Sequence, residues 1–145
     1  MRGEQGRIDM AGITAFPDIP DTMHGAFGTE MSYEADSAIL AGQIVQILST
    51  GKVSPATASS QKIIGVALYD IPAGTIGAVR VIGVARVANG DASTAITAGA
   101  PVTAGTLGGA VAASTGAYLG VALEPIAGGA TGLVTVSPGF NTEGA

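Results

Sequence analysis

Apolar and polar residues alternate along the stretch AVRVIGVARVA, which runs from Ala78 to Ala88. One face of this stretch carries Val79, Val81, Gly83, Ala85 and Val87, and the other carries Arg80, Ile82, Val84 and Arg86. A period of two residues is typical of a half-buried β-strand, because successive side chains point to opposite faces. We therefore expect a strand whose valine face lies in the core and whose two arginines point outward.

Other segments have the same character. QIVQILS and KIIGVALY are short, rich in β-branched residues and bounded by glycine, proline, aspartate or serine, which is the pattern of strands and turns. Glycine occurs 23 times in 145 residues. Since each glycine inside a helix costs about 1 kcal/mol relative to alanine, stable helices are not expected, and the pattern predicts an all-β fold.

The apolar pattern is written twice. ILAGQIVQILSTGKV, which starts at Ile39, aligns with ITAGAPVTAGTLGGA, which starts at Ile96, and the GVAL at Gly65 aligns with the GVAL at Gly120. The repeats therefore span residues 39–83 and 96–138. Because both copies place valines on the same face of the final strand, we expect them to pack as pseudo-symmetric halves of one compact β-sandwich or barrel.

The chain divides into an extended N-terminal arm (1–36), a single β domain (37–140) and a C-terminal tail (141–145). The arm has no sustained period and carries seven acidic residues against two basic ones. Its scattered apolar residues leave two interpretations open, a loosely ordered terminus or an arm that packs on a neighbouring subunit or another protein. The apolar residues on which the second interpretation depends are Ile8, Met10, Ile13, Phe16, Ile19, Met23, Phe27, Met31 and Tyr33.

The sequence offers little chemistry. There is no cysteine, and the single histidine, His24, has no companion ligand at metal-site spacing and no nucleophile assigned to it. Gly51 and Lys52 lack the upstream glycine and following hydroxyl of a phosphate loop. We predict no catalytic, cofactor or metal site, no small-molecule substrate and no enzymatic activity.

Composition also excludes two classes of partner. Lysine and arginine total six and form no cluster, whereas a nucleic-acid binder needs basic residues to neutralise phosphates. No uninterrupted apolar run reaches the length of a membrane span, and the N-terminus has no signal-peptide core. We therefore expect neither a nucleic-acid partner nor a membrane partner.

The ordered series AGQIVQIL, KIIGVALYDIPAG, GAVRVIGVARV, ITAGAPVT and YLGVALEPIAGGATGLVTV resembles a family of small capsid decoration and head-stabilising proteins of tailed phages. The resemblance covers about residues 39–138 and departs from the family pattern at Gln43, where an acidic residue is common. Members of the family have carried a label suggesting a RecA-like recombinase, which would need a phosphate loop and a basic surface that this sequence lacks.

The resemblance implies a structural virion protein, made in the host cytoplasm, that binds the outer surface of an icosahedral head as a homotrimer. Its partner would be the major capsid protein, whose subunits it would bridge. Residues proposed for capsid or subunit contact are Ile13, Phe16, Ile19, Phe27, Tyr33, Arg80 and Arg86. The alternative is an oligomeric virion-surface adhesion or carbohydrate-binding module, for which Tyr69 and Tyr118 are the candidate aromatic platform.

Overall fold

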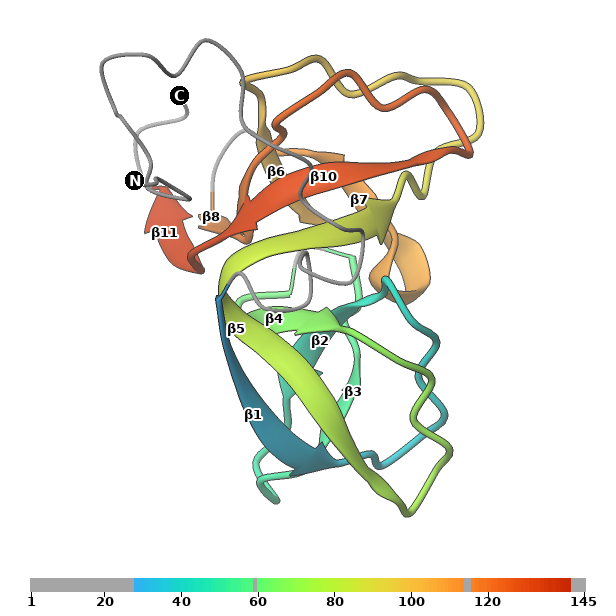
Figure 1. Ribbon diagram of the computed structural model, residues 1–145, viewed down its shortest axis with the longest axis vertical. Helices are drawn as coiled ribbons and strands as arrows, with labels where there is room; N and C mark the ends of the chain where they lie inside the picture. The colour runs from blue at the N-terminus through green and yellow to red at the C-terminus, as the bar shows by residue number, and fades with distance from the viewer. Residues whose placement is uncertain (1–27, 59, 114–115, 142–145) are drawn as a thin grey trace, which may run out of the picture.

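A computed structural model describes residues 28–58, 60–113 and 116–141 of the chain. This part is built of antiparallel strands, which confirms the predicted all-β class (Figure 1). None of its segments forms a helix long and apolar enough to cross a membrane. The elements are β1 (Gly28–Glu34), β2 (Ile44–Ile47), β3 (Val53–Pro55), β4 (Ile63–Ala67), β5 (Ile76–Ala88), β6 (Pro101–Ala104), the 3-10 turn η3 (Thr106–Gly108), β7 (Ala110–Ala112), β8 (Gly116–Tyr118), β9 (Gly120–Val121), β10 (Thr131–Val136) and β11 (Gly139–Asn141).

The first copy of the repeat forms a small barrel, the lower lobe in Figure 1. Its strands follow the order β1, β5, β4, β2, β3, and each neighbouring pair is antiparallel. A parallel bridge between Ala35, the residue after β1, and Val53 of β3 closes the sheet on itself. The core inside it is made of Ala35, Ile39, Val45, Val53, Ala67, Ile71 and Val79.

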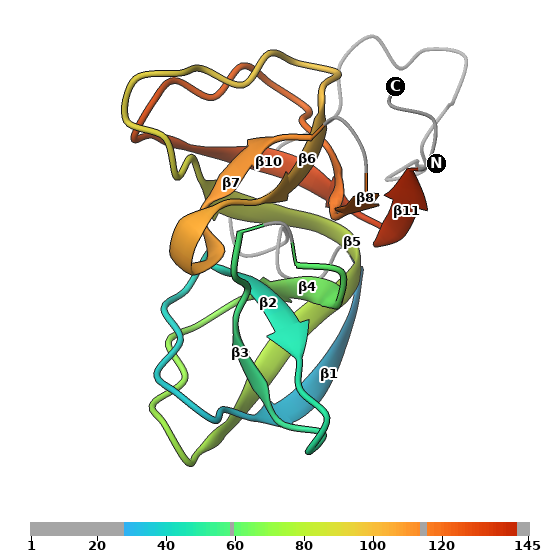
Figure 2. The same ribbon diagram turned by 180° about the vertical axis from the view of Figure 1, so that it is seen from behind.

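The second copy forms the upper lobe by the same plan (Figures 1 and 2). The second half of β5 pairs with β10, a bridge from Ala122 to Val134 links β10 to the end of β9, and β9 continues through β6 to β7. A parallel bridge between Asn89 and Ala110 closes this barrel, as the Ala35 bridge closes the first. β11 turns back and pairs with β8.

Strand β5 belongs to both barrels. Its first half pairs with β1 and β4, its second half pairs with β10, and Gly83 is the position that faces both Gly28 and Val136. The second half of β5 therefore does for the second barrel what β1 does for the first. Residues 28–34, which the sequence assigned to an extended arm, form a paired strand, so the structural repeat begins before Ile39.

Equivalent residues of the two copies make equivalent contacts. Ile39 and Ile71 exchange backbone hydrogen bonds of 2.9 and 2.8 Å, and Ile96 and Ile126 do so at 2.9 and 2.8 Å. The glycine that opens each GVAL unit allows a close backbone approach. A Cβ at Gly65 would collide with the carbonyl oxygen of Arg80, and a Cβ at Gly120 with that of Thr135.

The two copies pack against each other as predicted, but their buried residues form two cores, because each copy closes into its own barrel. Alternation along β2 explains the division: Val45 points into the first barrel, while Ile44 points out of it toward the second. The second core consequently extends across the boundary between the two barrels, which we call the seam. It includes Ile44, Ala56, Ile63 and Val66 of the first copy.

Gln43 fastens this seam. Its Nε2 donates to the carbonyl oxygen of Leu107 in η3 at 2.9 Å, and its Oε1 accepts the backbone N–H of Leu40 at 2.8 Å. Beside it, the N–H of Gly108 donates to the carbonyl oxygen of Ala56 at 2.7 Å. An amide can both donate and accept, whereas a carboxylate only accepts, so the glutamine that departs from the family pattern has a structural role here.

The connection after β5 is held by two side chains. Asn89 is 5% exposed, and its Nδ2 donates to the carbonyl oxygens of Thr94 and Ile126. The carboxylate of Asp91 accepts hydrogen bonds from the N–H and hydroxyl of Ser93 and from the N–H of Thr94. These hydrogen bonds, the Ser93 N–H first, lower the pKa of Asp91 below its ordinary value of 3.8.

Replacing Gln43→Glu should lower the free energy of unfolding at neutral pH by about 1 kcal/mol, because the hydrogen bond to Leu107 is lost. Urea denaturation followed by circular dichroism measures this. The deficit should shrink below about pH 4, where a protonated carboxyl regains a donor. Equal stability of parent and variant at pH 7 would show that the seam does not depend on this bond.

The lowered pKa of Asp91 predicts a dependence on pH. A carboxyl whose pKa is depressed on folding contributes stability above its unfolded-state pKa and loses that contribution as the pH falls through the folded-state pKa. NMR titration should place the Asp91 pKa below 3.8, and Asp91→Asn should flatten the fall in Tm below about pH 4. A variant whose Tm falls as steeply as that of the parent would contradict this.

Candidate functional site

No three histidine, cysteine, aspartate or glutamate side chains gather at metal-binding distance in the part of the chain that the structure describes. His24 lies outside that part, as do the proposed contact residues Ile13, Phe16, Ile19 and Phe27. A site in the described residues can therefore lie on the surfaces of the two barrels or among the charged groups on them.

The expectation that Arg80 points into solvent is wrong. Its side chain is 0% exposed, and its Nη2 lies 2.8 Å from Oε2 of Glu30. The register of β1 against β5 places Glu30 opposite Arg80, and Gly28 leaves room for the guanidinium, since a Cβ there would lie 2.7 Å from Arg80 Cδ. The sequence prediction failed because it left β1 out of the sheet.

Two further proposed contact residues lie in the described chain. Arg86 is exposed on the second half of β5, opposite Leu133 of β10. Tyr33 is half-buried against the first core, and its hydroxyl lies 3.7 Å from the sulfur of Met31. Of the three described residues proposed for contact, Arg86 alone is exposed.

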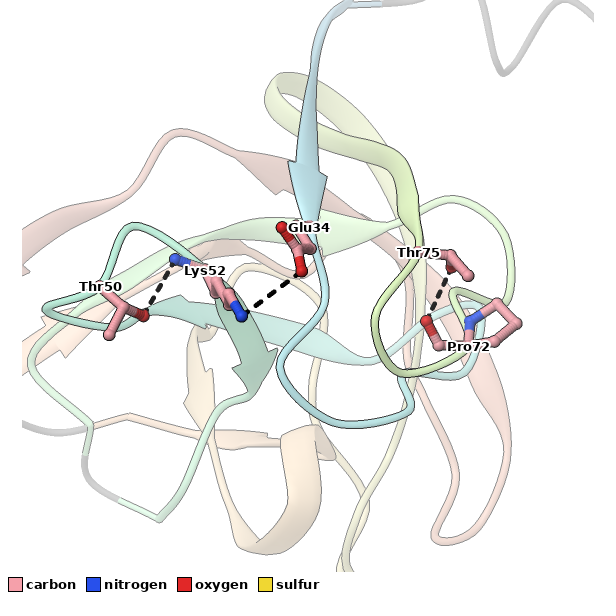
Figure 3. Close-up of polar contacts among 5 residues, drawn as sticks. All are labelled: Glu34, Thr50, Lys52, Pro72 and Thr75. Carbon is pink, nitrogen blue, oxygen red and sulfur yellow. Dashed lines mark hydrogen bonds and ion pairs between the residues drawn. The ribbon is translucent and has the colours of Figure 1, made fainter.

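Polar contacts brace the turns around the end of β1 (Figure 3). Glu34 forms an ion pair of 3.4 Å with Lys52, and both side chains are 43% exposed. On one side the backbone N–H of Lys52 meets the hydroxyl of Thr50, and on the other the hydroxyl of Thr75 donates to the carbonyl oxygen of Pro72 at 2.7 Å. These contacts hold the turns of the first barrel in place.

Three large apolar side chains are exposed on the connections of the first barrel. Leu40 lies on the β1–β2 connection, Tyr69 on the β4–β5 connection and Ile76 at the start of β5, with exposed fractions of 58%, 67% and 71%. The Ile39–Ile71 hydrogen bonds hold the two connections side by side along one side of the lower lobe (Figure 1). We call these three residues the apolar loop surface.

The second barrel is polar at the same positions. Thr97, Glu124 and Thr131 take the places of Leu40, Tyr69 and Ile76, as the equivalent Ile96–Ile126 pair shows. Glu124 has a structural task there, because its carboxylate accepts the N–H of Leu133 at 2.9 Å. Two copies of one fold thus differ in surface polarity at three matched sites. The other large apolar side chains that are exposed are Met31, Ile82, Leu107, Val121 and Leu123.

The apolar loop surface is not predicted from the repeat, because the repeat is recognised by its identical residues alone. The signal lay in the positions where the copies differ. Tyr69 and Tyr118, the candidate aromatic platform, lie in different barrels, and the Tyr118 ring faces β11, where a Cβ on Gly139 would lie 2.8 Å from its hydroxyl. The structure therefore does not bring Tyr69 and Tyr118 together into one aromatic platform.

Comparison with known proteins gives two findings. Residues 28–138 match the family described as phage cement protein. Among solved structures, the head fiber gp8.5 N base in bacteriophage phi29 has a TM-score of 0.61 and 21% sequence identity, over 75% of this chain and 93% of that one. At this identity the likeness concerns the fold. No curated protein sequence matches.

The two ion pairs of β1 should differ in their contribution to stability. Glu30→Ala removes the carboxylate from a fully buried guanidinium and should cost about 1.5–3 kcal/mol. Glu34→Ala breaks a pair that is nearly half exposed at both ends and should cost less than about 1 kcal/mol. Chemical denaturation of the two variants measures the difference. Similar losses for both would mean that burial of Arg80 does not strengthen its pair with Glu30.

Proposed function

Since the chain belongs to the phage cement protein family, we propose that it is a capsid decoration protein that binds the outer surface of an icosahedral phage head. In this role it bridges major capsid subunits and stabilises the shell. The family match over residues 28–138 carries the proposal. The shared fold supports it, because the solved neighbour is named as part of a phage head fiber.

The proposed mechanism is mechanical and involves no chemical reaction. Each bound copy adds contacts between shell subunits, and a change that pulls the subunits apart must break these contacts as well. Binding to the assembled shell alone stabilises that state by mass action, and several linked contacts strengthen the effect. The partner is the major capsid protein, and the homotrimer belongs to the same proposal. Its mass in solution, measured by analytical ultracentrifugation, tests the trimer.

The apolar loop surface is proposed as the part of the first barrel that faces the shell. Leu40, Tyr69 and Ile76 expose more than half of their surface, while the second barrel is polar at the matched positions. Burying a large apolar side chain contributes about 1.5–3 kcal/mol, so this asymmetry favours contact through the first barrel. The braced turns beside it reduce the loss of conformational freedom on binding.

Other predicted contact residues keep their place in the proposal. Arg86 is exposed and can contribute a charged contact. Ile13, Phe16, Ile19 and Phe27 are proposed to contact the capsid or a neighbouring subunit. Arg80 and Tyr33 are not proposed for direct contact, because the first is buried and the second packs against the first core.

The test exchanges the apolar loop surface for the residues of the second barrel. The triple variant Leu40→Thr, Tyr69→Glu and Ile76→Thr should fold with the parent's Tm to within a few degrees, because the same fold carries these residues in its other copy. Its affinity for expanded capsids that lack the decoration protein should fall by about tenfold or more. Co-sedimentation with such capsids measures binding, and the capsid melting temperature measures stabilisation.

A matched control removes apolar surface elsewhere. The double variant Leu107→Asn and Leu123→Thr changes side chains that are 70% and 49% exposed outside the apolar loop surface and should bind like the parent. Asparagine is chosen at position 107 because it tolerates the left-handed backbone found there, with a φ of 51°. If the parent itself does not bind or stabilise the capsids, the decoration function is wrong. If the parent binds and the triple variant binds equally well, the function stands and the assignment of the surface is wrong.

A further inference from the structure

Asn89 is fixed by the closure of the second barrel. Its Nδ2 donates to the carbonyl oxygens of Thr94 at 2.8 Å and Ile126 at 3.1 Å, and its Oδ1 accepts the N–H of Asp91 at 2.8 Å. Its backbone makes the parallel bridge to Ala110 that closes the barrel. An amide at this position therefore satisfies both donors and acceptors in a site that is 5% exposed.

Gly90 is equally constrained. A Cβ at this position would lie 2.9 Å from Cα of Gly109, so a larger residue cannot enter without moving backbone. Its N–H donates to the carbonyl oxygen of Ala110 at 2.8 Å. Packing thus requires an asparagine followed by a glycine at the closure of the second barrel.

An asparagine followed by glycine is prone to deamidation, because glycine has no Cβ to hinder its own nitrogen or restrict its backbone. The backbone nitrogen of Gly90 attacks Cγ of Asn89 and loses its proton to water or hydroxide. Nδ2 takes up a proton from water, the Cγ–Nδ2 bond breaks, ammonia leaves and a cyclic succinimide forms. Water then adds to one of the two imide carbonyls and gives an aspartyl or isoaspartyl residue, with no oxidation or reduction.

We propose that Asn89–Gly90 is a deamidation site that is protected from reaction while the second barrel is closed and becomes reactive when this barrel opens. In the closed state three hydrogen bonds fix the Asn89 amide, and the attacking N–H of Gly90 is held by Ala110. Opening at the Asn89–Ala110 bridge frees the N–H of Gly90, and loss of the hydrogen bonds to Thr94 and Ile126 frees the Asn89 amide, so both reacting groups are released when the second barrel opens around this connection.

The modification prevents normal closure afterwards. A carboxylate cannot donate to the carbonyl oxygens of Thr94 and Ile126, and a buried acceptor facing two acceptors is unfavourable. The isoaspartyl product also lengthens the backbone at the bridge. A transient opening is thereby converted into a permanent loss of the native second barrel, and such a subunit leaves the pool of intact protein.

The chain contains its own control for the experiment. Its other asparagine, Asn141, is followed by threonine. The full-length protein is incubated at mildly alkaline pH with and without concentrated urea, and peptide mapping by mass spectrometry follows both sites. In urea the Asn89 peptide should convert much faster than the Asn141 peptide. Without urea its conversion should be slower by about tenfold or more, because only the open fraction reacts.

A variant that loosens the connection without changing the reacting pair tests the gating. Asp91→Ala removes the carboxylate that holds Ser93 and Thr94. It should speed conversion of Asn89 in the absence of urea and leave the rate in urea nearly unchanged. Equal Asn89 rates with and without urea, or an unreactive Asn89 in urea, would overturn the proposal. Asn89→Asp should unfold at lower urea than the parent, and equal stability would overturn the permanent loss.

Discussion

The fold depends on one strand that serves two barrels. The odd-numbered face of β5 supplies Val79 to the first core and then Ala85 and Val87 to the second, so a single alternation of side chains must suit both. At the transition stands Gly83, with a φ of 131° and partners on both sides of the strand. β1, β4 and β10 pair directly with this shared strand, and it therefore joins the two barrels.

Most of this fold could be predicted from the sequence, because the residues that constrain the backbone most strongly occur in both copies. The glycine before each VAL, the paired isoleucines and the inward valines are fixed by contacts between neighbouring backbones, and both copies retain them. What the sequence hid was the first strand of each unit. Residues 28–34 and the second half of β5 share a place in the fold but almost no residues, so alignment began after them. The burial of Arg80 depended on that strand and could not be predicted without it.

Duplication also separates what a fold requires from what a surface can change. The two barrels keep the same ladder at Ile39–Ile71 and Ile96–Ile126 while their neighbouring side chains differ in polarity. The mismatched positions are visible in the sequence, but which of them are exposed can be told only from the structure. Gln43 shows the converse case, in which a departure from a family pattern is a contact across a seam that no linear pattern describes.

The boundary between β10 and β11 shows how such a series of barrels is interrupted. In the first copy Val81 is followed by Ile82 and Gly83, and the strand runs on to open a new barrel. In the second copy Val136 is followed by Ser137 and Pro138, and proline has no N–H to continue a ladder. β11 turns aside to β8 instead. The residues Ser137 and Pro138 thus mark the unit whose last strand ends, whereas Ile82 and Gly83 mark the unit whose last strand continues into another barrel.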